Sequence, residues 1–181
     1  WNEGKINQSH ASGNVTASSA TVSNAGGLAG YNARNVSNSS YVGNVTGNEN
    51  VGGIVGHNDG NVSDTFTATA APDPSVVDEG PIVGQNDGDI TDTYGATDLY
   101  GASSSSYGTG LTTAEMTGMN ATRTMGNLSF YDAWVPTKGG YPEPASLAGT
   151  DSTTEAAFDR YFAGDGTEAN PYQIADWNDL D

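Results

Sequence analysis

The chain repeats itself at intervals of 26 to 30 residues, and this repeat limits its possible folds more than any other feature. Four stretches align in one register: WNEGKI at 1–6, GGLAGYNARNV at 26–36, GGIVGHNDGNV at 52–62 and GPIVGQNDGDI at 80–90. An asparagine occupies one position of every copy, namely Asn2, Asn32, Asn58 and Asn86. Such a period is typical of solenoid-like arrays, in which each unit buries its few apolar residues against its neighbours.

Within a repeat, the pattern predicts short strands and tight turns. GGIVG at 52–56 reads as a small apolar strand, and NVSDTFTATA at 61–70 alternates with period two. We therefore expect an all-β fold, a parallel β-solenoid of about four repeats, with glycines at corners that need positive φ. The four asparagines should form a structural column of stacked amides. Pro81 replaces a repeat glycine, which places its strand at an edge or distorts it.

The register assigns each histidine to a column of stacked, mostly aromatic positions. The column of His57 holds Trp1, Tyr31 and Gln85. The column of His10 holds Phe66 and Tyr94, joined by Tyr41 after a one-residue insertion. We interpret both histidines as stacking residues, and a catalytic base or metal ligand is the less favoured alternative.

The composition is strongly acidic, with 22 acidic against 5 basic residues and a net charge of −17. This balance argues against nucleic acid or anionic membranes as partners. Salt screens repulsion between carboxylates, so the composition favours a halophilic source, with an ordinary acidic secreted protein as the alternative. The absence of cysteine excludes disulfides and thiolate metal sites. No apolar run approaches the roughly 18 residues that span a bilayer, so we expect no membrane insertion.

No motif points to catalysis, and we assign no catalytic residue, metal ligand or cofactor. The chain shows neither a nucleophile elbow nor a phosphate-binding glycine loop. Paired carboxylates of a glycosidase stay open, although no spacing selects a pair. Acidic residues cluster at Asp59 and Asp64 and again at Asp87, Asp89 and Asp92. NDGDITD at 86–92 matches a calcium loop only in part, so we interpret these acids as solvated surface charge, with calcium as the open alternative.

Eight N-x-S/T sequons are candidate N-glycosylation sites: Asn7, Asn14, Asn35, Asn38, Asn44, Asn61, Asn120 and Asn127. Asn14 and Asn44 are the first candidates because they lie in equivalent GNVT turns. Glycosylation depends on export and exposure. The alternative is that repeats rich in Asn, Ser and Thr copy the tripeptide without being modified.

After the repeats at 1–100, a polar break begins a capping segment at 101–142. Thr112 and Glu115 form an S/T-x-x-E capping box, which predicts a short helix near 112–118. The segment should pack over the last repeat through Phe130, Trp134 and Tyr141. Residues 143–160 read as a linker, and 161–181 as the opening segment of a further module or a subunit-docking segment.

The repeats resemble the GLUG-repeat family. GGLAGYNARNVSNSSYVGNVTG at 26–47 and GGIVGHNDGNVSDTF at 52–66 carry the resemblance, with looser copies at 1–16 and 80–94. Residues 110–118 and 130–142 resemble the segment that often closes such an array, and 161–181 the segment that usually opens one. The resemblance implies an exported bacterial or archaeal surface protein with no defined activity.

These features favour a non-enzymatic, extracellular structural or adhesive module of a filament, stalk or surface layer. Its partners would be other copies of itself, joined end to end, or neighbouring repeats of a longer chain. One alternative is a polysaccharide-binding module that uses Tyr94, Tyr100 and Tyr107. A less favoured alternative is an enzyme built on a β-helix.

Overall fold

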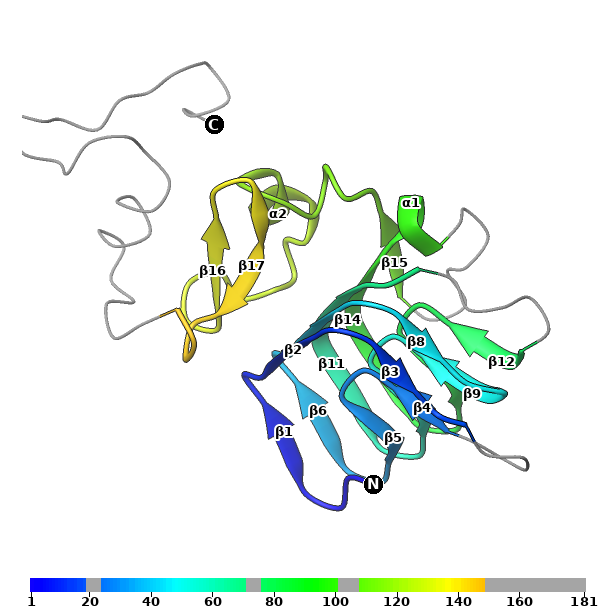
Figure 1. Ribbon diagram of the computed structural model, residues 1–181. Helices are drawn as coiled ribbons and strands as arrows, with labels where there is room; N and C mark the ends of the chain where they lie inside the picture. Colours follow the sequence, from blue (N-terminus) through cyan, green and yellow to red (C-terminus); the bar gives the residue numbers. More distant parts are fainter. Residues whose placement is uncertain (19–23, 71–75, 101–107, 149–181) are drawn as a thin grey trace, which may run out of the picture.

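The computed structural model is an all-β protein whose main sheets are parallel (Figure 1). It describes residues 1–18, 24–70, 76–100 and 108–148. The segment 161–181, expected to open a further module, and Tyr107 lie outside these ranges.

Strands from equivalent positions of the four repeats lie side by side. Repeat 1 (1–16) contains β1 (Lys5–Asn7), β2 (His10–Ser12) and β3 (Val15–Thr16). Repeat 2 (25–46) contains β4 (Ala25–Gly26), β5 (Ala29–Asn32), β6 (Asn35–Ser37), β7 (Ser40–Val42) and β8 (Val45–Thr46). Repeat 3 (49–68) contains β9 (Glu49–Gly52), β10 (Val55–Asn58) and β11 (Asn61–Ala68). Repeat 4 (77–96) contains β12 (Val77–Gly80), β13 (Val83–Asn86) and β14 (Asp89–Ala96).

Parallel pairing in register joins the repeats into several sheets. The largest runs β1-β6-β11-β14-β15 and also includes β2 and β7. Two three-stranded sheets run β4-β9-β12 and β5-β10-β13, and β3 pairs with β8. Small apolar side chains fill the space between the sheets: Val36, Ile54, Val55, Val62, Ile82 and Val83 have no exposed surface. Each repeat contributes few of these residues, so the core depends on the stacking of repeats.

The GGIVG stretch is a corner, which corrects the expectation of a strand there. β9 ends at Gly52 and β10 begins at Val55, while Ile54 points its fully buried side chain into the core. A Cβ atom on Gly52 would lie 1.9 Å from the carbonyl oxygen of Val55. The glycine therefore permits a close backbone approach, and a positive φ is not what the corner requires.

Positive φ angles occur at the equivalent turn glycines Gly13 and Gly43, with φ of 108° and 151°, so the expectation is confirmed at this turn and wrong at the GGIVG corner. They also occur at non-glycine residues. Gln8, Asn38, Asp64 and Asp92 occupy one position of the four repeats, with φ of 47°, 47°, 52° and 50°. Asparagine and aspartate adopt this left-handed conformation more readily than other side chains do. The residue with positive φ separates β1 from β2 and β6 from β7, and the equivalent residue lies inside β11 and β14.

One column differs from the predicted alignment. Ser40, and not Tyr41, lies opposite His10 and Phe66. Tyr41 is one residue further along, opposite Ala11, and its buried hydroxyl donates to the carbonyl oxygen of Gly13 at 2.5 Å. The predicted one-residue insertion is therefore absent, because the register stays constant from Asn7 to Ser12 against repeat 2.

Pro81 lies at the corner between β12 and β13, which are edge strands of their sheets. In earlier repeats this position must be glycine, because a Cβ on Gly53 would meet the Pro81 carbonyl oxygen at 2.1 Å. No further repeat follows Pro81 among the described residues, so its ring is accommodated at the edge, as expected.

The C-terminal described segment packs beside the repeats (Figure 1). It contains α1 (Thr97–Tyr100), β15 (Thr109–Leu111), α2 (Asn120–Thr124) and an antiparallel hairpin of β16 (Trp134–Thr137) and β17 (Gly140–Pro144). β15 extends the large sheet by pairing with β14. The short helix is at 120–124, and the predicted helix near 112–118 is absent. The hairpin reaches Pro144, past the expected start of the linker.

Aromatic contacts hold this segment against the side of the large sheet. Trp134 is 1% exposed and lies 5.2 Å from the Phe66 ring centroid, and Tyr141 stacks on Phe66 at 5.8 Å. Ser146 Oγ donates to the carbonyl oxygen of Gln8, in repeat 1. The segment therefore runs along several repeats, whereas we expected it to pack over the last one.

Candidate functional site

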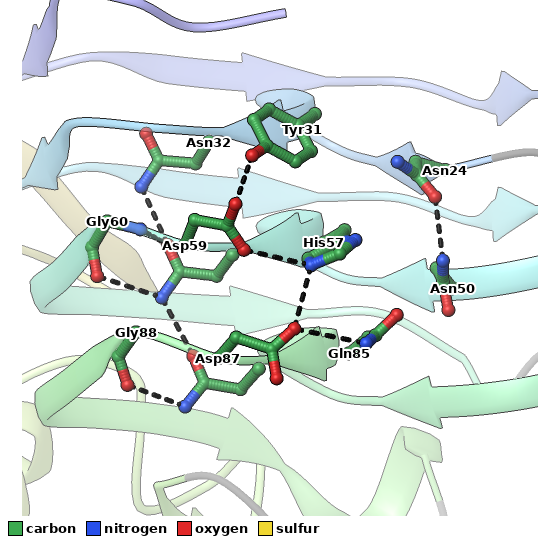
Figure 2. Close-up of polar contacts among 12 residues, drawn as sticks. Asn24, Tyr31, Asn32, Asn50, His57, Asp59, Gly60, Gln85, Asp87 and Gly88 are labelled. Carbon is green, nitrogen blue, oxygen red and sulfur yellow. Dashed lines mark hydrogen bonds and ion pairs between the residues drawn. The ribbon is translucent and has the colours of Figure 1, made fainter.

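The four asparagines of the repeat form a continuous hydrogen-bonded column, of which Figure 2 shows the later members. Asn2 Nδ2 donates to Asn32 Oδ1 at 2.7 Å, Asn32 Nδ2 to Asn58 Oδ1 at 2.7 Å, and Asn58 Nδ2 to Asn86 Oδ1 at 2.8 Å. All the bonds run in the same direction, from each repeat to the next. The column therefore links every repeat to its neighbour through side chains as well as through the backbone.

Each amide also closes a turn within its own repeat. Asn32 Nδ2 donates to the carbonyl oxygen of Arg34 at 3.0 Å, and Asn32 Oδ1 accepts the Arg34 N–H at 3.3 Å. Asn58 repeats both contacts with Gly60. An interior asparagine thus uses two donors and two acceptor positions, while it has no exposed surface. No other side chain offers this combination at this length.

The ends of the column are chemically different. Asn86 Nδ2 donates to the carbonyl oxygen of Gly88 at 2.9 Å, and among the described residues its second N–H meets no further amide. Asn2 Oδ1 accepts the N–H of Gly4 at 3.2 Å, with no preceding asparagine within the described ranges. One end therefore offers a donor and the other an acceptor.

A second polar column was not anticipated from the sequence. Asn24, Asn50 and Asp78 are equivalent positions of repeats 2, 3 and 4. Asn50 Nδ2 donates to Asn24 Oδ1 at 2.7 Å (Figure 2). Asn50 is only 3% exposed, and its Oδ1 has no hydrogen-bond partner. Asp78, which follows it in the column, has no amide N–H to donate. The sequence could have predicted this second column, because its residues have the same spacings of 26 and 28 as Asn32, Asn58 and Asn86.

The column of His57 forms an exposed polar group on the sheet surface (Figure 2). His57 pairs in register with Tyr31 and Gln85. Its Nε2 lies 3.0 Å from Asp59 Oδ1 and 3.0 Å from Asp87 Oδ2. The hydroxyl of Tyr31 donates to Asp59, and this contact is the main cause that raises the pKa of Tyr31. At the outer end of the column, the Trp1 ring stacks on Tyr31 at 4.2 Å.

This exposed group does not by itself indicate a calcium site. His57, Asp59 and Asp87 bring three ligand atoms within 4.8 Å of one another, whereas calcium takes six to eight oxygens. The other acids of NDGDITD lie apart from it. Asp89 continues the column of Asn61, and Asp92 accepts a hydrogen bond from Asn127 Nδ2 at 2.6 Å.

The sequons differ in how accessible their amides are. Asn14, Asn35, Asn44, Asn61, Asn120 and Asn127 are exposed. Asn7 and Asn38 are half-buried, and Asn7 Oδ1 accepts from Ser37 Oγ at 2.8 Å and from Asn38 Nδ2 at 3.1 Å. The first candidates Asn14 and Asn44 precede paired strands and lie on neighbouring repeats.

Two of the three tyrosines proposed to bind polysaccharide, Tyr94 and Tyr100, are not on the surface. Tyr94 is 4% exposed and Tyr100 is 7% exposed. Tyr94 packs with the C-terminal segment, and its hydroxyl accepts the N–H of Asn127. A glycan therefore cannot reach these two rings, and that assignment was wrong.

His10 is exposed, with its Nδ1 2.9 Å from Ser40 Oγ.

Comparison with known proteins finds no matching family model, characterised protein or solved structure. Within the described parts of the chain, no helix has the length and apolar character needed to cross a membrane.

Proposed function

We propose that the chain is a non-enzymatic structural or adhesive module of a prokaryotic surface filament, stalk or surface layer, and that it associates end to end. In this proposal its repeats form a parallel β-solenoid of the GLUG type, exported to a salty environment. The carrying observation is the asparagine column, which links each repeat to the next through the same contacts. An array joined by identical contacts extends when further repeats are added to it.

Two other observations support the proposal. The largest fully buried side chains come from the repeats and from the C-terminal segment, so the core joins the repeats to one another and to that segment. Acidic side chains lie on the surface, where Asp59 and Asp87 follow one another on neighbouring repeats. Such a surface keeps a protein dissolved when salt screens its charges.

Light scattering across a concentration series in molar sodium chloride tests the self-association. The mean mass should rise above the 18.5 kDa of a single chain as the concentration increases. A mass that stays at one chain up to millimolar protein would overturn end-to-end association.

Polysaccharide binding is the second candidate, and one observation favours it. Trp1 is 80% exposed and stacks on Tyr31 beside the Asp59 carboxylate. An exposed aromatic ring next to hydrogen-bond acceptors suits a sugar. A glycan array with the native chain and Trp1→Ala would separate the candidates, because binding lost in the variant supports this one.

A further inference from the structure

The last repeat has an outer edge that no described residue covers. Among the described residues, β13 pairs only with β10, and β14 pairs with β15 only from Tyr94 onward. This repeat lies in the middle of the sequence, and residues 149–181 are outside the described ranges. An unpaired strand edge is a template for another strand.

The backbone at this edge is arranged as it is where two repeats join. In each earlier repeat, the C=O of the column asparagine accepts an N–H from the following repeat: Asn2 from Ala33 at 3.0 Å, Asn32 from Asp59 at 2.8 Å and Asn58 from Asp87 at 2.8 Å. The C=O of Asn86 is the next in this series, and no described residue donates to it. The edge therefore offers an acceptor in the position where a further repeat would supply the donor.

The side chain of Asn86 is also incompletely used. One N–H of its amide meets the carbonyl oxygen of Gly88, and the other meets no further amide within the described ranges. Asn86 is half-buried, whereas Asn32 and Asn58 have no exposed surface. One more asparagine would give Asn86 the environment of the interior members of the column.

The sequence contains such an asparagine in one more copy of the repeat pattern. IADWNDLD at 174–181 aligns with IVGQNDGD at 82–89 and with IVGHNDGN at 54–61. In this alignment Asn178 falls in the asparagine column. Trp177 falls in the column of Tyr31, His57 and Gln85, and the same Trp-Asn pair begins repeat 1.

The copy can follow the path of the earlier repeats only from Trp177 onward. Asp176 takes the place of Gly84, and a Cβ on Gly84 would lie 2.5 Å from the backbone nitrogen of Val51. A side chain at this position therefore excludes the corner that the earlier repeats form.

Leu180 also replaces a glycine, but repeat 2 shows that this replacement fits. There Arg34 holds the same position and follows Gly4 of repeat 1, while the N–H of Asn35 donates to the Gly4 C=O at 3.3 Å. Leu180 would follow Gly88 in the same manner.

We infer that Trp177–Asp181 docks on Gln85–Asp89 of the same chain as the next parallel strand, and so covers the last repeat. Asn86 Nδ2 would donate to Asn178 Oδ1, in the direction of every other bond of the column. The Asn86 C=O would accept the N–H of Asp179. β15 keeps its place, because it pairs with β14 only from Tyr94, beyond the docked stretch.

The chain is long enough to reach its own edge. Ser146 is bonded to Gln8 in repeat 1, three strand spacings or about 14 Å from repeat 4. The 28 residues of 149–176 span up to roughly 90 Å when extended. A tether of this kind gives the segment an effective concentration in about the millimolar range, so in dilute protein the same chain is favoured over a second copy.

Two pairs of like charges oppose the docking in low salt. Asp179 would lie opposite Asp87, and Asp181 opposite Asp89. Like charges directly opposite each other destabilise paired strands, and molar salt screens them. The docking should therefore strengthen as the salt concentration rises.

This inference goes beyond the proposed function, because the contact forms within one chain. It also bears on the proposed association, since a second copy that adds at this edge has to displace the segment first. The docked segment would therefore weaken end-to-end association at the last repeat.

Cysteine cross-linking tests the docking, because the native chain has no cysteine. In Asp89→Cys/Asp181→Cys, the two Cα atoms would lie one strand spacing apart, about 4.8 Å, within the range for a disulfide. Lys5→Cys/Asp181→Cys is the matched control, because Lys5 is exposed and holds the same column position in repeat 1. Under mild oxidation of dilute protein in molar salt, the first variant should form a closed monomer about tenfold or more faster than the control.

A second pair of variants tests the asparagine bond. Asn178→Ala, added to Asp89→Cys/Asp181→Cys, should slow closure by about threefold or more, the equivalent of one hydrogen bond. Asn170→Ala is the control, since it removes an amide from the same segment outside the docked stretch.

Equal closure rates for the two cysteine pairs would overturn the inference. A product of covalent oligomers without closed monomer in dilute protein would also overturn it, because the segment would then dock on a second copy. Neither result decides the proposed self-association, which light scattering on the native chain measures separately.

Discussion

Replacing Asp78 with asparagine should stabilise the protein, because it completes the second polar column. Asn50 Oδ1 is buried without a hydrogen-bond partner, and Asp78 is the next residue of that column. Asp78 has φ of 56° and Asn50 has φ of 49°, so the backbone already has the conformation that the preceding asparagine adopts. The new amide N–H would donate to Asn50 Oδ1, as Asn50 Nδ2 donates to Asn24.

The gain follows from the net free energy of one hydrogen bond. A buried acceptor without a partner costs about 1–3 kcal/mol, and an intramolecular hydrogen bond contributes about 0.5–1.5 kcal/mol. Because Asp78 is exposed, we expect about 1 kcal/mol from Asp78→Asn. For a domain of this size, that raises the melting temperature by roughly 2–4 °C.

Thermal unfolding followed by circular dichroism measures the change. Asp89→Asn is the matched control, because it removes the same charge at an exposed position that follows Asn61 in its column. Molar salt minimises the general effect of charge removal. The reasoning is refuted if Asp78→Asn gains no more than Asp89→Asn, or if its gain persists when Asn50 is replaced by alanine.

Three further predictions test the columns, the surface charge and the capping box. Asn58→Asp should lower the free energy of unfolding, measured in urea, by about 2–4 kcal/mol, because it removes two buried donors and buries a charge. Asn86→Asp, at the end of the asparagine column, should lower it by about 1 kcal/mol. Equal losses for the two variants would contradict the role of the column. The melting temperature should rise between about 0.1 M and about 2 M sodium chloride, since Asp59 and Asp87 repel each other on neighbouring repeats; a flat or falling profile would exclude this reason. The Thr112 N–H and hydroxyl hold the pKa of Glu115 below 4.5, so this carboxylate stabilises the fold above pH 4.5 and ceases to do so as the pH falls through the lowered pKa. Glu115→Ala should therefore melt lower than the native chain at pH 7 and match it in strong acid.

The repeat register could be predicted because the asparagine spacing aligns the copies without knowledge of the turns. Once Asn32, Asn58 and Asn86 are superposed, the partners of His57 follow by counting residues. The same counting gives Ser40 as the partner of His10 and Phe66, and Tyr41 was placed one residue away from its true partners because the prediction assumed an insertion that the structure does not have.

Glycine could not be interpreted from the sequence alone, because it meets two different needs. It permits positive φ, and it also permits close approach of two backbones. At Gly52 the second need applies, and it depends on the position of Val55, which only the folded chain determines. Positive φ angles lie at Gly13 and Gly43 but also at Asn38, Asp64 and their equivalents, where the preference of asparagine and aspartate for this conformation is too weak to identify the position from the sequence.

The capping box shows how a correct local prediction can give a wrong element. Thr112 and Glu115 do exchange the expected bonds, with Thr112 N–H donating to Glu115 at 2.7 Å and Glu115 N–H to Thr112 Oγ1 at 3.3 Å. The turn does not continue as a helix, and the N–H of Gly118 donates to the carbonyl oxygen of Gly140 in the hairpin at 3.0 Å. The packing of Trp134 against Phe66 was likewise out of reach, since it brings together residues 68 positions apart.

The repeats differ in length at one connection only, and this gives the fold a natural insertion point. Four residues separate Thr46 from Val51, against eight between the equivalent Thr16 and Ala25. Six residues separate Val42 from Glu49, against eight between the equivalent Ala68 and Val77. Both asparagine columns and the buried valines keep their register despite this variation. The chain therefore already holds connections of different length between repeats that stay in register. A foreign loop, such as an epitope or an enzyme recognition peptide, inserted at this connection should leave both columns in register.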